Sequence, residues 1–178
     1  MWFDYSTGKF EYLQNESGAK NTISPGSVRF IFEYNNEYYA SPSSGGLYKV
    51  KLENGKLRAY SSHLFSPLND KITNYFCSYY KDINDVFWFG TAGEGLVRYD
   101  IKNKEIKIFD KSKGLPNNVI YGVESSILNP NYIWLSTNKG VVAFNRNTEL
   151  FYTFSEEDGL MSNELNLGAS FVAKNGEI

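Results

Sequence analysis

Gly95-Leu96-Val97-Arg98-Tyr99-Asp100 is a six-residue stretch that the chain repeats with small changes. The pattern returns as GVVAFN at 140–145 and as GLYKVK at 46–51, and its tail opens the chain as MWFD at 1–4. An apolar or aromatic residue near the end of each copy serves as a marker, at Phe3, Val50, Tyr99 and Phe144. Successive markers are 47, 49 and 45 residues apart. A recurring period of about 20 to 50 residues is typical of repeat architectures.

Each repeat contains four short stretches in which apolar and polar residues alternate. One begins seven residues after the marker in every copy, and another precedes the glycine, as in VFWFGTAGEG at 86–95 and YIWLSTNKG at 132–140. Alternation with a period of two, bounded by Gly, Asn, Pro and Ser, is typical of β-strands. Four strands per repeat predict an all-β chain of four-stranded antiparallel blades, the unit of a β-propeller. The alternative, a β-sandwich, does not require the same side chains at the same offsets.

The repeat positions predict a single partial β-propeller with three complete blades and two partial ones. The expected boundaries are 1–22 for the end of one blade, 23–68, 69–116 and 117–162 for the three blades, and 163–178 for the start of a further blade. Trp88 and Trp134 occupy one position of the repeat, and Tyr39 replaces them in the first complete blade. Because the position recurs, packing between neighbouring sheets explains these aromatic side chains better than sugar stacking does.

Composition and charge exclude several classes of function. The net charge of −2 offers no basic surface to a phosphate backbone, so we expect no nucleic-acid partner. No apolar run reaches the roughly 18 residues of a spanning helix, so we expect no membrane insertion by this segment. Cys77 is the only cysteine and His63 the only histidine, which leaves no internal disulfide and no Cys/His zinc cluster. We expect Cys77 to be a buried structural thiol, and the sequence indicates no metal or other cofactor.

The chain also lacks the patterns that accompany catalysis. The carboxyl groups of Glu156, Glu157 and Asp158 lie in a polar connection without apolar surroundings that would shift a pKa. His63 lies in a serine-rich connection with no nucleophile motif beside it. We therefore expect no enzymatic activity from this chain.

Three motifs together resemble the two-component regulator propeller repeat: Trp88-Phe89-Gly90-Thr91, the stretch 95–100, and GLPNN at 114–118. The resemblance implies a large propeller in the periplasmic sensor region of a hybrid two-component regulator. The stretch 159–178 looks like the last repeat before the sandwich domain that joins such propellers to a membrane helix. The histidine kinase, phosphoacceptor and DNA-binding parts of such regulators have no counterpart in this sequence.

The resemblance alone suggests that the ligand is an oligosaccharide. Propellers bind ligands on the face formed by the loops between second and third strands and between a fourth strand and the next blade. The candidate ligand-binding residues on this face are Tyr75, Tyr121, Asn74, Asn118, Glu94, Asn138 and Lys139. The two tyrosines also fit a simpler role, which is to line the central channel.

A second hypothesis is a structural or protein–protein interaction propeller that mediates dimerisation and has no small-molecule ligand. Partial blades leave unpaired edge strands, which favour self-association through those edges. The first residues would supply the third and fourth strands of a composite blade, and 165–178 would supply its first and second strands.

Overall fold

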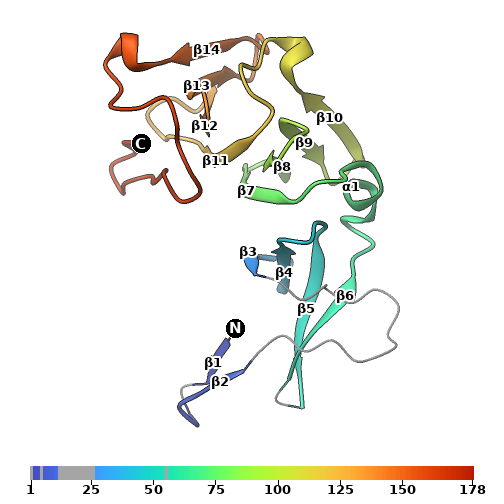
Figure 1. The fold of residues 1–178 in the computed structure, drawn as a ribbon. Helices are drawn as coiled ribbons and strands as arrows, with labels where there is room; N and C mark the ends of the chain where they lie inside the picture. The colour runs from blue at the N-terminus through green and yellow to red at the C-terminus, as the bar shows by residue number, and fades with distance from the viewer. Residues whose placement is uncertain (1, 5, 12–26, 55) are drawn as a thin grey trace. The chain divides into compact units, whose positions relative to one another are not determined.

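The computed structural model of the chain describes residues 2–4, 6–11, 27–54 and 56–178 (Figure 1). The chain divides into two compact units, Met1–Tyr75 and Phe76–Ile178. The first unit contains a two-stranded sheet of β1 (Trp2–Asp4) and β2 (Lys9–Glu11). Its four-stranded sheet consists of β3 (Val28–Tyr34), β4 (Glu37–Pro42), β5 (Tyr48–Glu53) and β6 (Lys56–Ser61), and helix α1 (Ser66–Lys71) follows.

The second unit contains two four-stranded sheets. The first of them consists of β7 (Phe76–Lys81), β8 (Val86–Thr91), β9 (Leu96–Asp100) and β10 (Glu105–Phe109). The other consists of β11 (Ile120–Glu124), β12 (Tyr132–Thr137), β13 (Gly140–Asn145) and β14 (Phe151–Phe154). The 3-10 turns η1 (Lys111–Lys113) and η2 (Glu156–Asp158) follow the two outer strands.

All three four-stranded sheets are antiparallel, and their strands lie side by side in chain order (Figure 1). This is the meander of a propeller blade, in which each strand pairs with its neighbour in sequence. The predicted fold class, an all-β propeller fragment of four-stranded antiparallel blades, is therefore confirmed. The blade that has Tyr39 in place of tryptophan forms its second strand, β4, like the other two.

The seven-residue spacing noted in the sequence becomes a direct pairing across a hairpin. Phe3 pairs with Phe10 in β1 and β2, Tyr99 pairs with Ile106 in β9 and β10, and Phe144 pairs with Phe151 in β13 and β14. The hairpin of β5 and β6 differs, because there Val50 pairs with Ala59. Three of the four hairpins thus share one register, and the β1–β2 hairpin corresponds to the second half of a blade.

A β-bulge recurs in the first strand of every four-stranded sheet. The pairing register shifts at Arg29 in β3, at Cys77 in β7 and at Tyr121 in β11. A bulge inserts one extra residue opposite its partner strand and increases the local twist. Cys77 is buried, as predicted.

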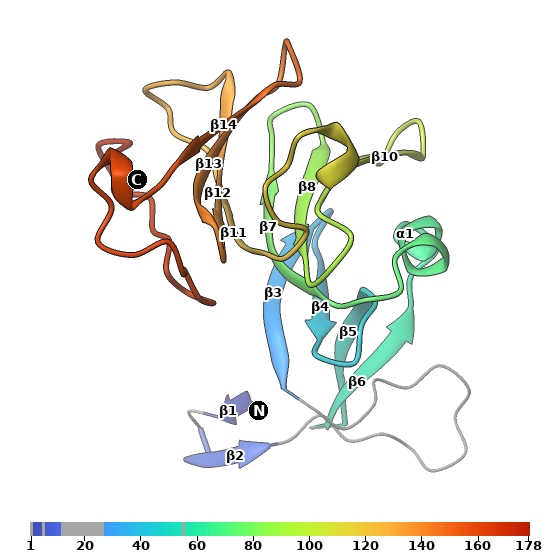
Figure 2. The same ribbon diagram turned by 45° about the horizontal axis from the view of Figure 1, so that its top comes forward.

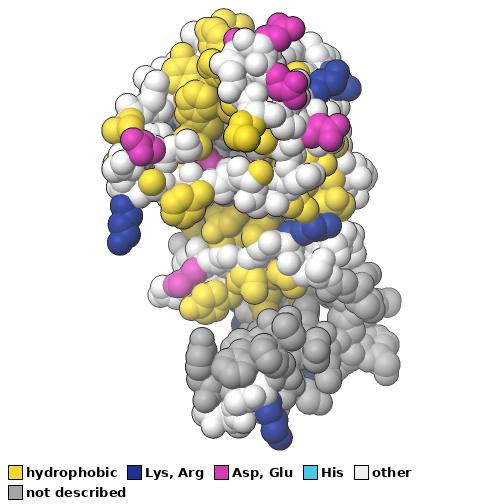
Figure 3. All heavy atoms as spheres, turned by 60° about the vertical axis from the view of Figure 1, so that its left-hand side comes forward, with side chains coloured by type: hydrophobic (Ala, Val, Ile, Leu, Met, Phe, Trp, Pro, Cys, Tyr) yellow, Lys and Arg dark blue, Asp and Glu magenta, His cyan; other side chains and the backbone are white. Residues whose placement is uncertain are grey.

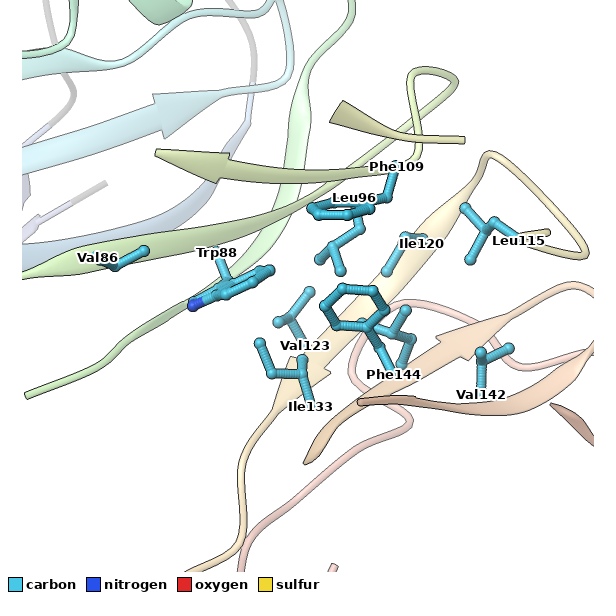
Figure 4. Packing of buried hydrophobic residues seen from close by; sticks show 11 residues of the cluster. Val86, Trp88, Leu96, Phe109, Leu115, Ile120, Val123, Ile133, Val142 and Phe144 are labelled. Atoms are coloured by element: carbon cyan, nitrogen blue, oxygen red, sulfur yellow. The ribbon is translucent and has the colours of Figure 1, made fainter. Parts of the chain in front are cut away.

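Aromatic side chains fill the space between the two sheets of the second unit (Figure 4). Trp88, which is 4% exposed, stacks on Phe109 of its own sheet with ring centroids 6.3 Å apart. Phe144 of the next sheet completes the group, at 5.6 Å from Trp88 and 4.8 Å from Phe109. Aromatic pairs at these separations contribute about 0.5–1.5 kcal/mol each beyond the burial of their surface.

Trp134 repeats the arrangement of Trp88 within its own sheet. Its ring stacks on Phe154 with centroids 5.9 Å apart and an interplanar angle of 29°, compared with 24° for Trp88 and Phe109. Trp134 is only half-buried, because no described strand of this unit lies beyond it. Trp88 therefore has the packing role between neighbouring sheets that its spacing predicted, whereas Trp134 stacks on a residue of its own sheet.

The four-stranded sheet of the first unit has an aromatic core of its own. Tyr39 is fully buried and lies 5.4 Å from Phe32 and 5.0 Å from Phe65 between ring centroids. Its hydroxyl donates a hydrogen bond of 3.0 Å to the Oε2 atom of Glu37. Burial, and after it this bond to a carboxylate, raises the pKa of Tyr39 to about 12. Tyr39 thus takes the packing role of the tryptophans and pairs its polar tip at the edge of the core.

Two segments differ from the sequence-based expectation. Helix α1 forms where a loop was expected, with Pro67 in its first turn, a position that suits proline because the missing N–H needs no partner there. The described residues 163–178 were expected to begin a further blade but contain no strand. A strand requires a neighbour to pair its backbone groups, and this segment instead folds back beside the sheet of β11 to β14 (Figure 2).

Replacing Gly140 with alanine is expected to destabilise the second unit more than the same change at Gly159 does. Both residues have a positive φ, +88° and +101°, which costs a non-glycine residue about 1–2 kcal/mol. At Gly140 the added Cβ would also collide with the carbonyl oxygen of Phe154, whereas at Gly159 no described atom lies within 4 Å. Overpacking adds about 1–3 kcal/mol. Urea denaturation followed by circular dichroism measures both variants, and equal losses would contradict the close approach at Gly140.

Truncating Trp88 to alanine is expected to lower the free energy of unfolding of the second unit by about 3–5 kcal/mol. The matched change Trp134→Ala is expected to cost at least about 1 kcal/mol less, because that ring already keeps part of its surface in water. The same denaturation experiment, run at low protein concentration, compares the two. A larger loss at Trp134 than at Trp88 would show that the packing between the sheets has been misassigned.

Candidate ligand-binding face

A buried threonine closes the turn between the second and third strands in both sheets of the second unit. The Thr91 hydroxyl donates to the carbonyl oxygen of Gly95 at 2.8 Å and accepts from the Glu94 amide at 2.9 Å. The Thr137 hydroxyl donates to the carbonyl of Gly140 and accepts from the Lys139 amide, both at 2.9 Å. The two turns therefore have the same internal frame, which fixes the backbone at the loop tips.

An asparagine ties each of these turns to the connection that leads to the next blade. The Gly95 amide donates to the Asn118 carbonyl at 2.9 Å, and the Asn118 Oδ1 atom accepts from the Lys111 amide at 2.8 Å. In the other blade the Gly140 amide donates to the Asn163 carbonyl at 2.7 Å. The Asn163 Oδ1 atom accepts from the Glu156 amide at 2.8 Å. The amide oxygen of Asn118 therefore makes a hydrogen bond inside the fold. Asn163 holds its own turn in the same way, and the sequence analysis did not identify it.

The seven predicted site residues lie on both units. In the second unit the structure brings Glu94 and Asn118 together through the Gly95 contact, while Asn138 and Lys139 are exposed at the next turn. Tyr121 is half-buried at the bulge of β11.

The other two predicted residues belong to the first unit. Asn74 is exposed and Tyr75 is half-buried, directly before β7. The Arg29 guanidinium carbon lies 4.6 Å from the centroid of the Tyr75 ring. Tyr75 therefore precedes the first strand, whereas Tyr121 lies inside one, so the two tyrosines occupy different positions of the repeat.

The carboxyl groups with shifted pKa values are all more acidic than usual. The Ser112 hydroxyl bonds to Asp110 and lowers the pKa of that carboxyl, and bonds from Asn103 lower the pKa of Asp100. Lys49 and Lys81 lower the pKa values of Glu37 and Asp85 in the same way. These groups are ionised at neutral pH and accept hydrogen bonds from neighbouring side chains or backbone amides. Among the described residues no three His, Cys, Asp or Glu side chains group to hold a metal, and no helix could span a membrane.

A polar hollow that sequence reasoning missed lies at the opposite end of these blades. It has a volume of about 450 Å³, and its walls come from four separate hairpin turns. Arg146 crosses it: its guanidinium lies 3.8 Å from Asp82 Oδ2, donates to Ser125 Oγ at 2.7 Å, and packs 5.2 Å from the Tyr80 ring centroid. The buried Nε1 atom of Trp88 and Nε atom of Arg146 have no hydrogen-bond partner among the described residues. Figure 4 shows the indole nitrogen turned away from Phe144.

Comparison with known proteins gives matches that are longer than this chain. No family model matches it. Histidine kinase P4 of Formosa agariphila is 33% identical over 83 residues, which is 47% of this chain and 5% of that protein. The chain thus spans about a twentieth of this curated relative.

Solved structures match over most of the chain. The extracellular domain of a proposed hybrid two-component system from B. thetaiotaomicron has a TM-score of 0.60 at 18% identity, over 80% of this chain and 20% of that one. A second such domain from the same organism has a TM-score of 0.60 at 16% identity, over 90% and 22%. PorZ, a surface component of the type-IX secretion system of Porphyromonas gingivalis, has a TM-score of 0.55 at 11% identity, over 91% and 25%. The chain therefore has the fold of these extracellular domains of two-component systems, in agreement with the resemblance of its motifs.

Proposed function

We propose that the chain is a non-catalytic, ligand-sensing β-propeller segment from the periplasmic sensor region of a hybrid two-component signal transduction protein, and that its ligand is an oligosaccharide. The shared fold with extracellular domains of two-component systems supports a sensor role and an extracytoplasmic location. The partial match to a histidine kinase supports a signalling parent protein.

One observation carries the proposal: successive blades hold the same turn rigidly and present different side chains at its tip. The threonine and asparagine bonds fix both turns of the second unit. The tips differ, with Ala92-Gly93-Glu94 in one blade and Asn138-Lys139 in the next. Loops with varied tips on a rigid scaffold are where proteins usually place binding residues.

The chemistry of the tips suits a hydroxylated ligand. The exposed amide of Asn138 and the ammonium group of Lys139 offer both donors and an acceptor to sugar hydroxyls. Asn118 supports the loop and does not need to touch the ligand.

A structural or protein–protein interaction propeller without a small-molecule ligand is the second candidate. The observation that favours it is the row of partly exposed aromatic side chains on the outer sheet of the second unit, which includes Tyr152 and Phe154. Apolar surface of this kind commonly marks a contact with another protein.

Calorimetric titration of the chain with a panel of oligosaccharides tests the sensing proposal. We expect at least one glycan to bind, and the double change of Asn138 and Lys139 to alanine to weaken its binding roughly tenfold or more, because hydrogen bonds from a charged group are lost. Lys174→Ala, which removes an exposed lysine elsewhere in the unit, is the matched control and should bind normally.

Two other outcomes would redirect or reject the proposal. Binding that survives the Asn138 and Lys139 changes but is lost in Asn147→Ala would move the site to the Arg146 hollow, which Asn147 lines. The absence of heat with every member of a broad panel would count against a carbohydrate ligand and leave the interaction role.

A further inference from the structure

The Arg146 hollow is a cavity of about 450 Å³ that four hairpin turns of the second unit surround. The turns join β7 to β8, β9 to β10, β11 to β12 and β13 to β14, so both blades contribute to its walls. Its lining is polar, unlike the side of the chain that Figure 3 brings forward, where hydrophobic side chains gather. Small-molecule sites commonly have volumes of about 300–1,000 Å³, so the hollow has room for a small ligand.

Two buried N–H groups of the hollow have no hydrogen-bond acceptor among the described residues. They are the Nε1 group of Trp88 and the Nε group of Arg146. Trp88 is 4% exposed, and Figure 4 shows its indole nitrogen turned away from Phe144. The guanidinium carbon of Arg146 lies 6.0 Å from the centroid of the Trp88 ring, so the two groups lie in the same part of the hollow. Because buried N–H groups nearly always have an acceptor, these two indicate a ligand that supplies one.

The arginines of the hollow lack a carboxylate at hydrogen-bond distance. The Arg146 guanidinium lies 3.8 Å from Asp82 Oδ2. The Arg98 guanidinium likewise lies 3.8 Å from Asp100 Oδ2. Both separations exceed the length of an N–H···O hydrogen bond. Each of the two aspartates instead accepts backbone amides of its own turn through Oδ1, at 2.9 to 3.1 Å. The two guanidinium groups are therefore able to bind an anionic group of a ligand.

The acidic side chains in the lining limit the charge that this ligand can carry. Glu149 lines the hollow and is paired with Lys107, from outside the lining, at 2.5 Å. With Lys107 included, four basic side chains face three acidic ones, a net charge of +1. A single carboxylate matches this balance, whereas the acidic groups would repel a phosphate dianion. The acidic residues are Asp82, Asp100 and Glu149, and the basic ones are Arg98, Lys102, Arg146 and Lys107.

The rim of the hollow suits hydroxyl groups. Asn84, Asn131 and Asn147 line it from three different turns, and all three are exposed. An asparagine side chain offers both a donor and an acceptor, as a hydroxyl group does. The rim therefore favours a ligand that carries several hydroxyl groups beside its carboxylate.

Arg146 is not part of the repeated framework of the blade. It directly follows GVVAFN at 140–145, and the residues that directly follow the other two copies of this stretch are Leu52 and Ile101. The position is thus apolar in two blades, and Ile101 is buried. An arginine that crosses a cavity at such a position indicates a role that is specific to this blade.

We propose that the Arg146 hollow binds a sugar acid, a small ligand in which one carboxylate accompanies several hydroxyl groups. The carboxylate accepts hydrogen bonds from Trp88 Nε1 and Arg146 Nε, and Arg98 adds its positive charge. The asparagines of the rim bind the hydroxyl groups. This site lies at the opposite end of the blades from the turns that hold Glu94 and Lys139. It therefore goes beyond the sensing role proposed for that face and does not depend on it.

Nuclear magnetic resonance titration of the nitrogen-15-labelled chain with D-glucuronate tests this site. We expect the indole N–H resonance of Trp88 to shift, because its nitrogen gains an acceptor. The resonance of Trp134, which does not line the hollow, is the internal control and should not move. D-Glucose lacks the carboxylate and acetate lacks the hydroxyl groups, so each should bind at least about tenfold more weakly.

Two arginine variants locate the binding. Arg146→Gln removes the charge and the Nε donor, and it should weaken glucuronate binding by more than about tenfold. Arg98→Gln should also weaken binding, and it changes a side chain with fewer contacts to the core, which keeps the test valid if Arg146→Gln fails to fold. Lys174→Ala is the matched control and should bind normally. Circular dichroism checks that every variant is folded.

Four outcomes overturn the proposal. The first is a Trp88 resonance that stays in place at every concentration of glucuronate, and the second is an equal response to glucose or to acetate. The third is binding that persists unchanged in both arginine variants. The fourth is binding that only the double change of Asn138 and Lys139 abolishes, since the sugar acid would then occupy the other face. The first three leave the sensing proposal for that face untouched.

Discussion

The packing of one blade against the next is the constraint on which the rest of the structure depends. A four-stranded sheet has two faces, and in this chain the faces carry large aromatic side chains that gain stability only when they leave water. Trp88 and Phe109 achieve this because Phe144 arrives from the following blade. Gly95 and Gly140 precede or begin the third strand of their blades, and their amides donate to the carbonyls of Asn118 and Asn163 in the connection that follows each blade. These bonds fix where the connection leaves its blade, which supports the packing.

Much of the fold could be predicted because residues that pair across a hairpin are separated by a fixed number of positions in the sequence. Residues that pair across β9 and β10, such as Tyr99 and Ile106, are separated by a constant number of positions, and the same number appears in two other hairpins. Helix α1 could not be predicted in the same way, because six residues are too few to show an apolar period. The segment 163–178 was expected to begin a further blade because it follows the third complete repeat. Strand formation depends on a pairing partner, however, and no local pattern reports whether one is present.

The candidate site could be located from the sequence, but the roles of its residues could not. Counting strands places the loops on one face, which is how Glu94, Asn138 and Lys139 were chosen. Asn118 seemed to be a ligand group, yet its side chain holds the backbone of η1. The signal that could have revealed this was Asn163 at the same position of the next repeat. A residue that recurs from blade to blade more often stabilises the structure of the blade than binds a ligand. The Arg146 hollow was missed because hairpin turns far apart in sequence form it together.

The bulge in the first strand of each four-stranded sheet is a position where the side chain can vary without a change in the sheet. Arg29, Cys77 and Tyr121 occupy this point in the three sheets, and they have little in common in size, charge or polarity. A bulged residue stands outside the regular ladder, so the neighbouring strand imposes little on its side chain. Such a position can change its identity while the sheet keeps its hydrogen bonds. In a protein assembled from copies of one unit, this gives each copy a place to diverge without loss of the shared shape.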